Sequence, residues 1–91
     1  MISSQRRYIP SMAAIRSFEA AARHQSFTLA ASELNLTQSA VSRQVKEMEH
    51  IVGAQLFRRT GREVILTRAG TRLASDLSSE LDNISSVMMR A

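Results

Sequence analysis

The stretch that decides the fold is LNLTQSAVSRQVKEMEH, residues 34–50. Val41, Val45 and Met48 recur at helical spacing, and Val52 continues the same stripe one turn later. The side chains on the opposite face are small or polar: Gln38, Ser39, Ser42, Arg43 and Lys46. The stretch therefore predicts a helix from Gln38 to about residue 51 with an inward apolar face and an outward polar face.

The residues before this helix predict a shorter helix joined to it by a tight turn. Ser26 or Thr28 can cap a helix of about two turns. Asn35 tolerates left-handed backbone, and Thr37 is placed to cap the following helix. Leu36, between them, is expected to be an apolar plug. The pair of helices then forms a helix-turn-helix.

A further helix is predicted before this pair, over residues 12–23. Ser11 is its expected N-cap. Its inward stripe consists of Ile15, Phe18 and Ala22, with Met12 and Ala14 beside it. These three helices supply the apolar core of a small domain.

Beyond Gly53, which can end the polar-faced helix, the sequence changes to strand-forming residues. QLFRR (residues 55–59) and REVIL (62–66) flank the pair Thr60-Gly61, which can form a tight hairpin turn. Alternation along a strand means that neighbouring arginines of this hairpin point to opposite faces. We expect a small β-hairpin wing with arginines near its tip.

The final segment, residues 67–91, predicts a long helix capped by Thr67. From Gly70 onward its apolar residues step by four and three, as in a coiled coil. The residues expected at a dimer interface are Leu73, Ala74, Leu77, Leu81, Ile84 and Met88. A helix of this length exceeds what a small core covers, so a symmetric partner is expected to bury the stripe. The alternatives are that the helix folds back on its own domain or only links it to a further segment.

Composition agrees with one mainly helical domain. The 91 residues contain no cysteine, and glycine and proline together number four, which favours helices and excludes a disulfide-stapled fold. The fold class predicted is a winged helix-turn-helix over residues 1–66, followed by a linker helix over residues 67–91. No apolar run resembles a transmembrane span or a signal peptide, so a cytoplasmic protein is expected.

The charges fall in blocks. Residues 1–46 carry net +4, residues 47–57 net −2, residues 58–72 net +4 and residues 73–91 net −2. Two separated basic blocks suggest a polyanion contacted at two places, whereas the acidic tail should point away from it. Solvated basic faces without any partner are the alternative.

The polar helix face has the chemistry of a recognition helix. Slim serines allow close approach to a major groove, and Arg43 and Gln38 can pair with guanine and adenine. The base-reading candidates are Gln38, Ser39, Ser42 and Arg43. The candidates for the DNA backbone and the wing are Ser26, Thr28, Thr37, Lys46, Arg58, Arg59, Thr60 and Arg62.

The sequence gives less support to functions other than DNA binding. His24 and His50 are far apart, and no metal-ligand cluster or glycine-rich phosphate loop occurs, so neither an enzyme nor a metal or other cofactor is predicted. The rival is a winged helix used for protein–protein assembly, which would more often expose an apolar patch on the same face.

The residues taken together resemble the N-terminal DNA-binding domain of LysR-type bacterial transcriptional regulators. The resemblance rests on FEAAARHQSFTLAASELNLTQSAVSRQVKEME followed by GAQLFRRTGREVILTRAG, and runs from about residue 11 to residue 70. ARHQSFT (residues 22–28) is similar to the branch with glycine-cleavage and β-lactamase regulators.

The resemblance implies a homodimer formed through the linker helix and bound to an interrupted inverted repeat in double-stranded DNA. It implies base contacts from the four candidates above and a backbone contact from Arg59. Members of this family are typically about three times longer. We therefore expect an effector-binding domain, with its small-molecule site and tetramer contacts, to lie outside this chain.

Overall fold

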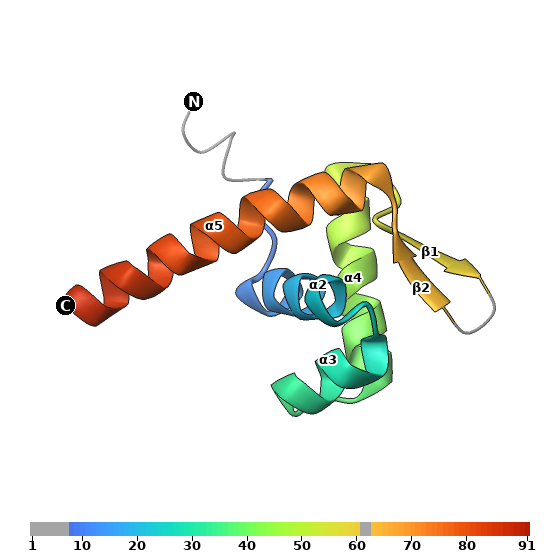
Figure 1. The fold of residues 1–91 in the computed structure, drawn as a ribbon, viewed down its shortest axis with the longest axis horizontal. Helices are drawn as coiled ribbons and strands as arrows, with labels where there is room; N and C mark the ends of the chain where they lie inside the picture. The colour runs from blue at the N-terminus through green and yellow to red at the C-terminus, as the bar shows by residue number, and fades with distance from the viewer. Residues whose placement is uncertain (1–7, 61–62) are drawn as a thin grey trace.

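The computed structural model describes residues 8–60 and 63–91. In this part of the chain, four helices and a two-stranded antiparallel hairpin follow one another (Figure 1). In chain order they are α2 (Met12–His24), α3 (Phe27–Leu34), α4 (Gln38–Val52), β1 (Phe57–Thr60), β2 (Glu63–Leu66) and α5 (Arg68–Arg90). The predicted mainly α, winged helix-turn-helix class is confirmed.

Each of these helices begins at a hydroxyl side chain. Its oxygen accepts a hydrogen bond from the backbone N–H of the third helical residue, at 3.0 to 3.1 Å. The caps are Ser11, Ser26, Thr37 and Thr67. Of the two cap candidates for α3, Ser26 is the cap and Thr28 lies exposed in the first turn. Such a cap typically stabilises a helix by about 1 kcal/mol.

The turn between α3 and α4 is closed by a left-handed residue. Asn35 has φ 56°, and the N–H of Leu36 donates to the carbonyl oxygen of Ala31 at 2.9 Å. Thr37 then caps α4 directly, so only three residues separate the two helices. The predicted helix-turn-helix is confirmed.

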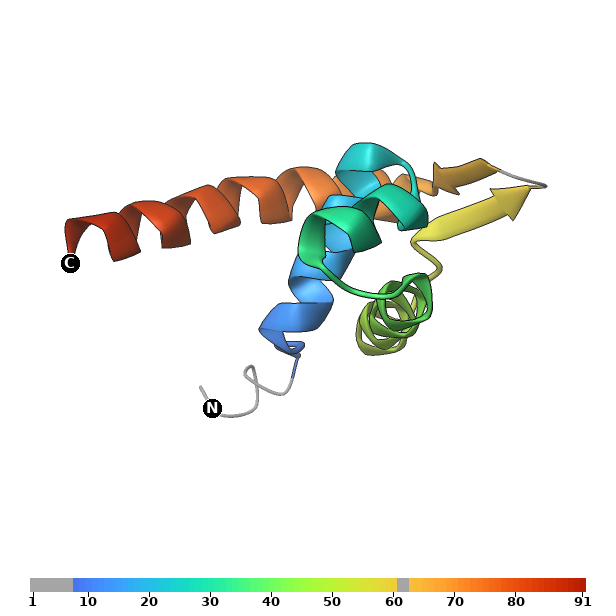
Figure 2. The same ribbon diagram turned by 90° about the horizontal axis from the view of Figure 1, so that it is seen from below.

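The core lies where α2, α3 and α4 meet the base of the hairpin. Phe18, Val41 and Met48 are fully or almost fully buried, as predicted. Phe57, the first residue of β1, packs its ring edge-to-face against Phe18 and against Phe27, with centroids 5.7 and 5.3 Å apart. Figure 2 shows α4 nearly end-on beside the hairpin. These aromatic contacts hold the start of β1 against α2 and α3.

Three apolar residues expected in the interior are exposed instead: Met12, Leu36 and Val52 are 49%, 38% and 43% accessible. Met12 and Val52 are the first and last residues of their helices, where the chain overhangs the core. Leu36 lies in the turn, outside either helix. The prediction of Leu36 as an apolar plug was wrong, because the side chain of this turn residue does not pack against the core.

The hairpin pairs one residue differently from the prediction. Phe57 pairs with Leu66, and Thr60 pairs with Glu63, so Thr60 belongs to β1 and the turn is not centred on Thr60-Gly61. The connecting pair, residues 61–62, lies outside the described residues. The register follows from Phe57 and Leu66, whose side chains both pack on the core face.

Helix α5 divides into two halves. Gly70 is buried, and Leu73, Ala74 and Leu77 pack against the core of their own chain. Farther along, the helix extends beyond the other elements (Figure 1). Ile84 is 46% exposed there. The first half of the predicted seam therefore folds back on its own domain, and only the second half stays uncovered.

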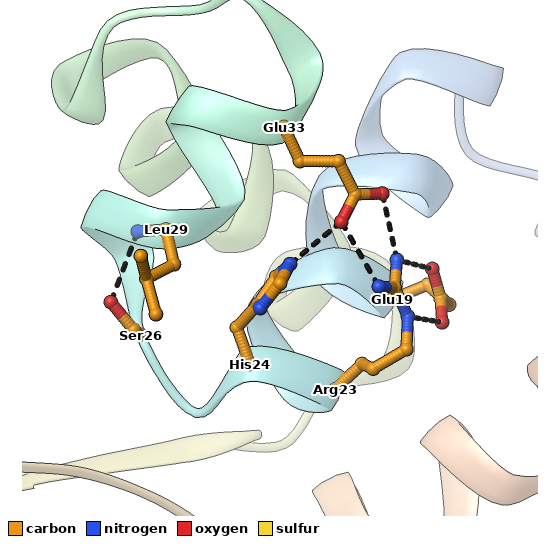
Figure 3. A network of polar contacts seen from close by, with 6 residues as sticks. All are labelled: Glu19, Arg23, His24, Ser26, Leu29 and Glu33. Carbon is orange, nitrogen blue, oxygen red and sulfur yellow. Dashed lines mark hydrogen bonds and ion pairs between the residues drawn. The ribbon is translucent and has the colours of Figure 1, made fainter.

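A cluster of ion pairs joins the end of α2 to α3 (Figure 3). The Arg23 guanidinium binds the carboxylates of Glu19 and Glu33, each at 2.8 Å, and His24 Nε2 lies 2.6 Å from Glu33 Oε1. The hydrogen bonds from Arg23 first, and the contact with His24 second, lower the pKa of Glu33 to about 2. The cluster thus favours ionised Glu33 in the folded state.

A Glu33→Gln variant should therefore change how stability depends on pH. Because the folded pKa is depressed, the stabilisation is complete above the ordinary pKa of about 4.3 and is lost as the pH falls toward 2. The deficit of the variant near pH 7 should be below about 1 kcal/mol, since the pairs are partly exposed and screened. Urea unfolding of the variant and the wild type at pH 2 to 7 measures this difference in the free energy of unfolding, with Asp82→Asn on α5 as control. A deficit that persists unchanged at pH 2 would contradict this role.

Candidate nucleic-acid interface

The N-terminal half of α4 presents the predicted recognition face. Gln38, Ser39 and Arg43 are exposed and Ser42 is half-buried, while Val41 on the opposite side is fully buried. Val52, the large apolar residue of α4 that is exposed in the described structure, lies at the far end of the helix from Gln38. The face therefore offers amide, hydroxyl and guanidinium groups to a partner.

Strand alternation directs the two arginines of β1 to opposite faces. Phe57 points into the core, so Arg59 two residues later is on the same face of the hairpin, toward α4. Arg59 Nη2 donates to Ser42 Oγ at 2.9 Å, and its guanidinium carbon lies 4.6 Å from the centroid of the Phe27 ring. Arg58 is exposed on the other face. The prediction that they diverge is confirmed.

Two adjoining hollows run between α4, the start of α3 and the hairpin. The first is lined by residues that include Ser26, Thr28, Gln38, Arg59 and Glu63. The second is lined by Phe27, Gln38, Ser39, Ser42, Arg43, Lys46 and Arg59. The structure therefore gathers the four base-reading candidates, Lys46, Arg59 and the start of α3 along one surface.

The other backbone candidates have different surroundings. Thr37 Oγ1 is occupied as the cap of α4, accepting from Ala40 N–H at 3.1 Å. Arg58 and Thr60 are exposed but line neither hollow. Arg62 lies outside the described residues. The wing thus contributes Arg59 to the surface that it shares with α4, and Arg58 and Thr60 to a separate one.

The position of the wing beside α4 also depends on two residues that the sequence does not predict at the interface. The Phe27 ring packs against the Arg59 guanidinium, and Phe27 is only 4% exposed. Glu49 accepts hydrogen bonds from the backbone N–H groups of Leu56 at 2.8 Å and Phe57 at 3.4 Å, which ties the end of α4 to the start of β1. A phenylalanine beside a cap signals only packing, and a glutamate paired with backbone leaves no sequence pattern.

Chemically, the surface can bind an anion and read hydrogen-bonding groups. Among residues 8–60 and 63–91, no three histidine, cysteine or acidic residues are grouped as metal ligands would be. Within the same ranges, no helix has the length and hydropathy needed to span a bilayer. The exposed chemistry suits a polyanion with donor and acceptor edges.

A model of a known protein family matches most of this chain. The family model described as "Bacterial regulatory helix-turn-helix protein, lysR family" matches residues 12–71. The HTH-type transcriptional activator AmpR of Citrobacter freundii is 46% identical over 85 residues, which are 93% of this chain and 29% of AmpR. The glycine cleavage system transcriptional activator of Escherichia coli K12 is 49% identical over 69 residues, which are 76% of this chain and 23% of that protein.

Both relatives are transcriptional activators and not enzymes, as expected for this chain. The chain spans less than a third of the length of either. The resemblance of residues 22–28 to the glycine-cleavage branch agrees with the second relative.

Solved structures give the same fold. Oxidised OxyR of Corynebacterium glutamicum superposes with a TM-score of 0.83 at 33% identity, covering 90% of this chain and 26% of OxyR. A crystal structure of the BenM_DBD/catB site 1 DNA complex superposes with a TM-score of 0.80 at 32% identity, covering 85% of this chain and 86% of that one. That neighbour is bound to DNA.

Proposed function

Since this chain belongs to the lysR family of bacterial regulatory helix-turn-helix proteins, we propose that it binds double-stranded DNA sequence-specifically as the DNA-binding domain of a transcriptional regulator. Helix α4 enters the major groove, and the wing lies on the phosphate backbone or in the adjoining minor groove. The observation that carries the proposal is the shared surface of α4 and the wing, with its slim, hydrogen-bonding residues beside Arg59 and Lys46.

Base reading on this surface falls to four side chains of α4. Arg43 is exposed and can donate two hydrogen bonds to guanine, and Gln38 can pair with adenine. Ser39 and Ser42 keep the helix slim between them. The N–H groups at the start of α3, beside Thr28, can bind a phosphate. An assembly surface for another protein would expose apolar side chains here, and on α4 the large apolar residue that is exposed, Val52, lies at the end opposite Gln38.

Two copies paired through α5 would recognise an inverted repeat. The part of α5 after Leu81 is exposed, and Ile84 and Met88 on it are 46% and 70% accessible. Pairing two such helices antiparallel would bury these residues and set two α4 helices at a fixed separation. A palindromic operator then follows from the twofold axis.

Effector binding and higher assembly are assigned to segments outside this chain. We place the small-molecule site and any tetramer contact in the remaining length of a full regulator, acting in the bacterial cytoplasm. DNA binding by these residues then requires no metal or cofactor, and it should survive a chelator.

Replacing Arg43 with alanine tests the base-reading role. Loss of a bidentate contact should weaken binding to the preferred duplex by about 1–3 kcal/mol and relax the preference at one position of each half-site. Competition between duplexes that differ at single base pairs measures this, with fluorescence anisotropy as the readout. Lys46→Ala is the matched control, because loss of a phosphate contact should weaken all duplexes alike. An unchanged pattern of base preference in Arg43→Ala would remove this residue from the reading face.

A further inference from the structure

One hydrogen bond joins the wing to the reading face. Arg59 Nη2 donates to Ser42 Oγ at 2.9 Å, although the two residues are 17 positions apart in the chain. Ser42 lies between the exposed reading residues and lines the hollow that contains Gln38 and Arg43. A residue of the wing therefore controls the hydroxyl of a residue that should face the bases.

A second contact, with the Phe27 ring, also holds Arg59 in this position. Its guanidinium lies over the Phe27 ring at 4.6 Å from the centroid, and Phe27 is only 4% exposed. The Phe27 ring packs edge-to-face on Phe57, which is on the same face of β1 as Arg59. The position of Arg59 in β1, its cation–π contact with Phe27 and its hydrogen bond to Ser42 thus all direct the Arg59 side chain toward α4.

The bond determines what the Ser42 hydroxyl offers to a partner. A serine hydroxyl has one donor and two acceptor lone pairs, whereas arginine has donors only. The bond from Arg59 therefore occupies a lone pair and leaves the O–H free to donate. The positive guanidinium beside the oxygen also disfavours a second N–H donor there. Among the residues that the structure describes, Ser42 Oγ makes no other hydrogen bond.

We propose that Arg59 positions the Ser42 hydroxyl as a hydrogen-bond donor. At the base that Ser42 faces, α4 then tolerates only a base that offers a hydrogen-bond acceptor in the major groove. Major-groove acceptors are N7 and O6 of guanine, N7 of adenine and O4 of thymine, whereas cytosine presents an amino donor. The inference rests on the proposed function, since it concerns the same surface bound to DNA. Cytosine is then the base excluded by Ser42.

The test uses duplexes built on the wild-type preferred site, with all four base pairs at each position of the half-site. Ser42→Ala should lose about three- to tenfold of discrimination against cytosine at one position, as expected for one hydrogen bond. Arg59→Met should lose discrimination at the same position, and should change nothing further there in the Ser42→Ala background. Arg58→Met, which removes an equal charge from the opposite face of β1, is the matched control and should weaken all duplexes alike.

The outcomes separate the two proposals. Arg59→Met that weakens all duplexes equally, with base preference intact, would overturn the inference and make Arg59 a backbone contact only. Wild-type protein without any preferred duplex would overturn the proposed function. Circular dichroism checks that each variant is folded. Arg59→Lys, which keeps the positive charge and an N–H donor, supplies a second comparison and should retain more discrimination at the Ser42 position than Arg59→Met does.

Discussion

A Gly70→Ala variant should be less stable than the wild type by about 3 kcal/mol, even though alanine is the better helix former. In an open helix this change would stabilise by about 1 kcal/mol. Here a Cβ on Gly70 would overlap the carbonyl oxygen of Leu56 and come within 2.9 Å of Leu66 Cδ2. Because the obstacle is backbone, α5 would have to move away from the base of the hairpin, and overpacking of this kind typically costs 1–3 kcal/mol or more.

Urea unfolding followed by helical circular dichroism at one protein concentration measures this loss. Gly53→Ala is the matched control, because nothing lies within 4 Å of the added Cβ. Its φ of 73° should cost only about 1 kcal/mol of backbone strain. Gly70→Ala with wild-type stability would show that α5 does not pack this closely on Leu56.

A Leu81→Asp variant should weaken dimerisation about a hundredfold, or about 2.7 kcal/mol. Leu81 is half-buried without packing against the core of its own chain, and it lies directly before the exposed part of α5. In a twofold pairing both copies would bury an unpaired carboxylate, which costs far more than the leucine contact that is lost. Leu77 is a poorer site for this test, because it packs against the core of its own chain.

Sedimentation over a concentration series measures the dimer dissociation constant. Ser79→Asp is the matched control, since it adds the same charge to an exposed position on the other side of α5. The control should dimerise like the wild type. Equal dissociation constants for Leu81→Asp and the wild type would remove α5 from the dimer interface.

The parts of the fold that depend on local chemistry could be predicted from the sequence. The hydroxyl caps at Ser11, Thr37 and Thr67 and the left-handed Asn35 follow from preferences of single residues. The stripe of α4 follows from its period. Exposure at the helix ends could not be predicted, because whether Met12 or Val52 is covered depends on where another element stops.

The exposure of the candidate residues on α4 could be predicted from the sequence, but the hydrogen bonds between them and the wing could not. Gln38, Ser39 and Arg43 were assigned from the polar face of α4, and they are exposed there. The contact of Arg59 with Ser42 requires the hairpin register and the position of the wing on α4, which arise from long-range packing of Phe57. Alternation predicts that Arg58 and Arg59 diverge, and the structure adds the hydrogen bond of Arg59 to Ser42.

Selection of bound duplexes from a random pool by the wild-type chain shows whether the protein recognises a DNA sequence. We expect convergence on two half-sites related by a twofold axis, with strong preference at the few positions that α4 can reach. Retention should weaken as salt rises, because phosphates are also contacted. A pool that is retained by the protein yet never converges on a sequence would contradict sequence-specific recognition.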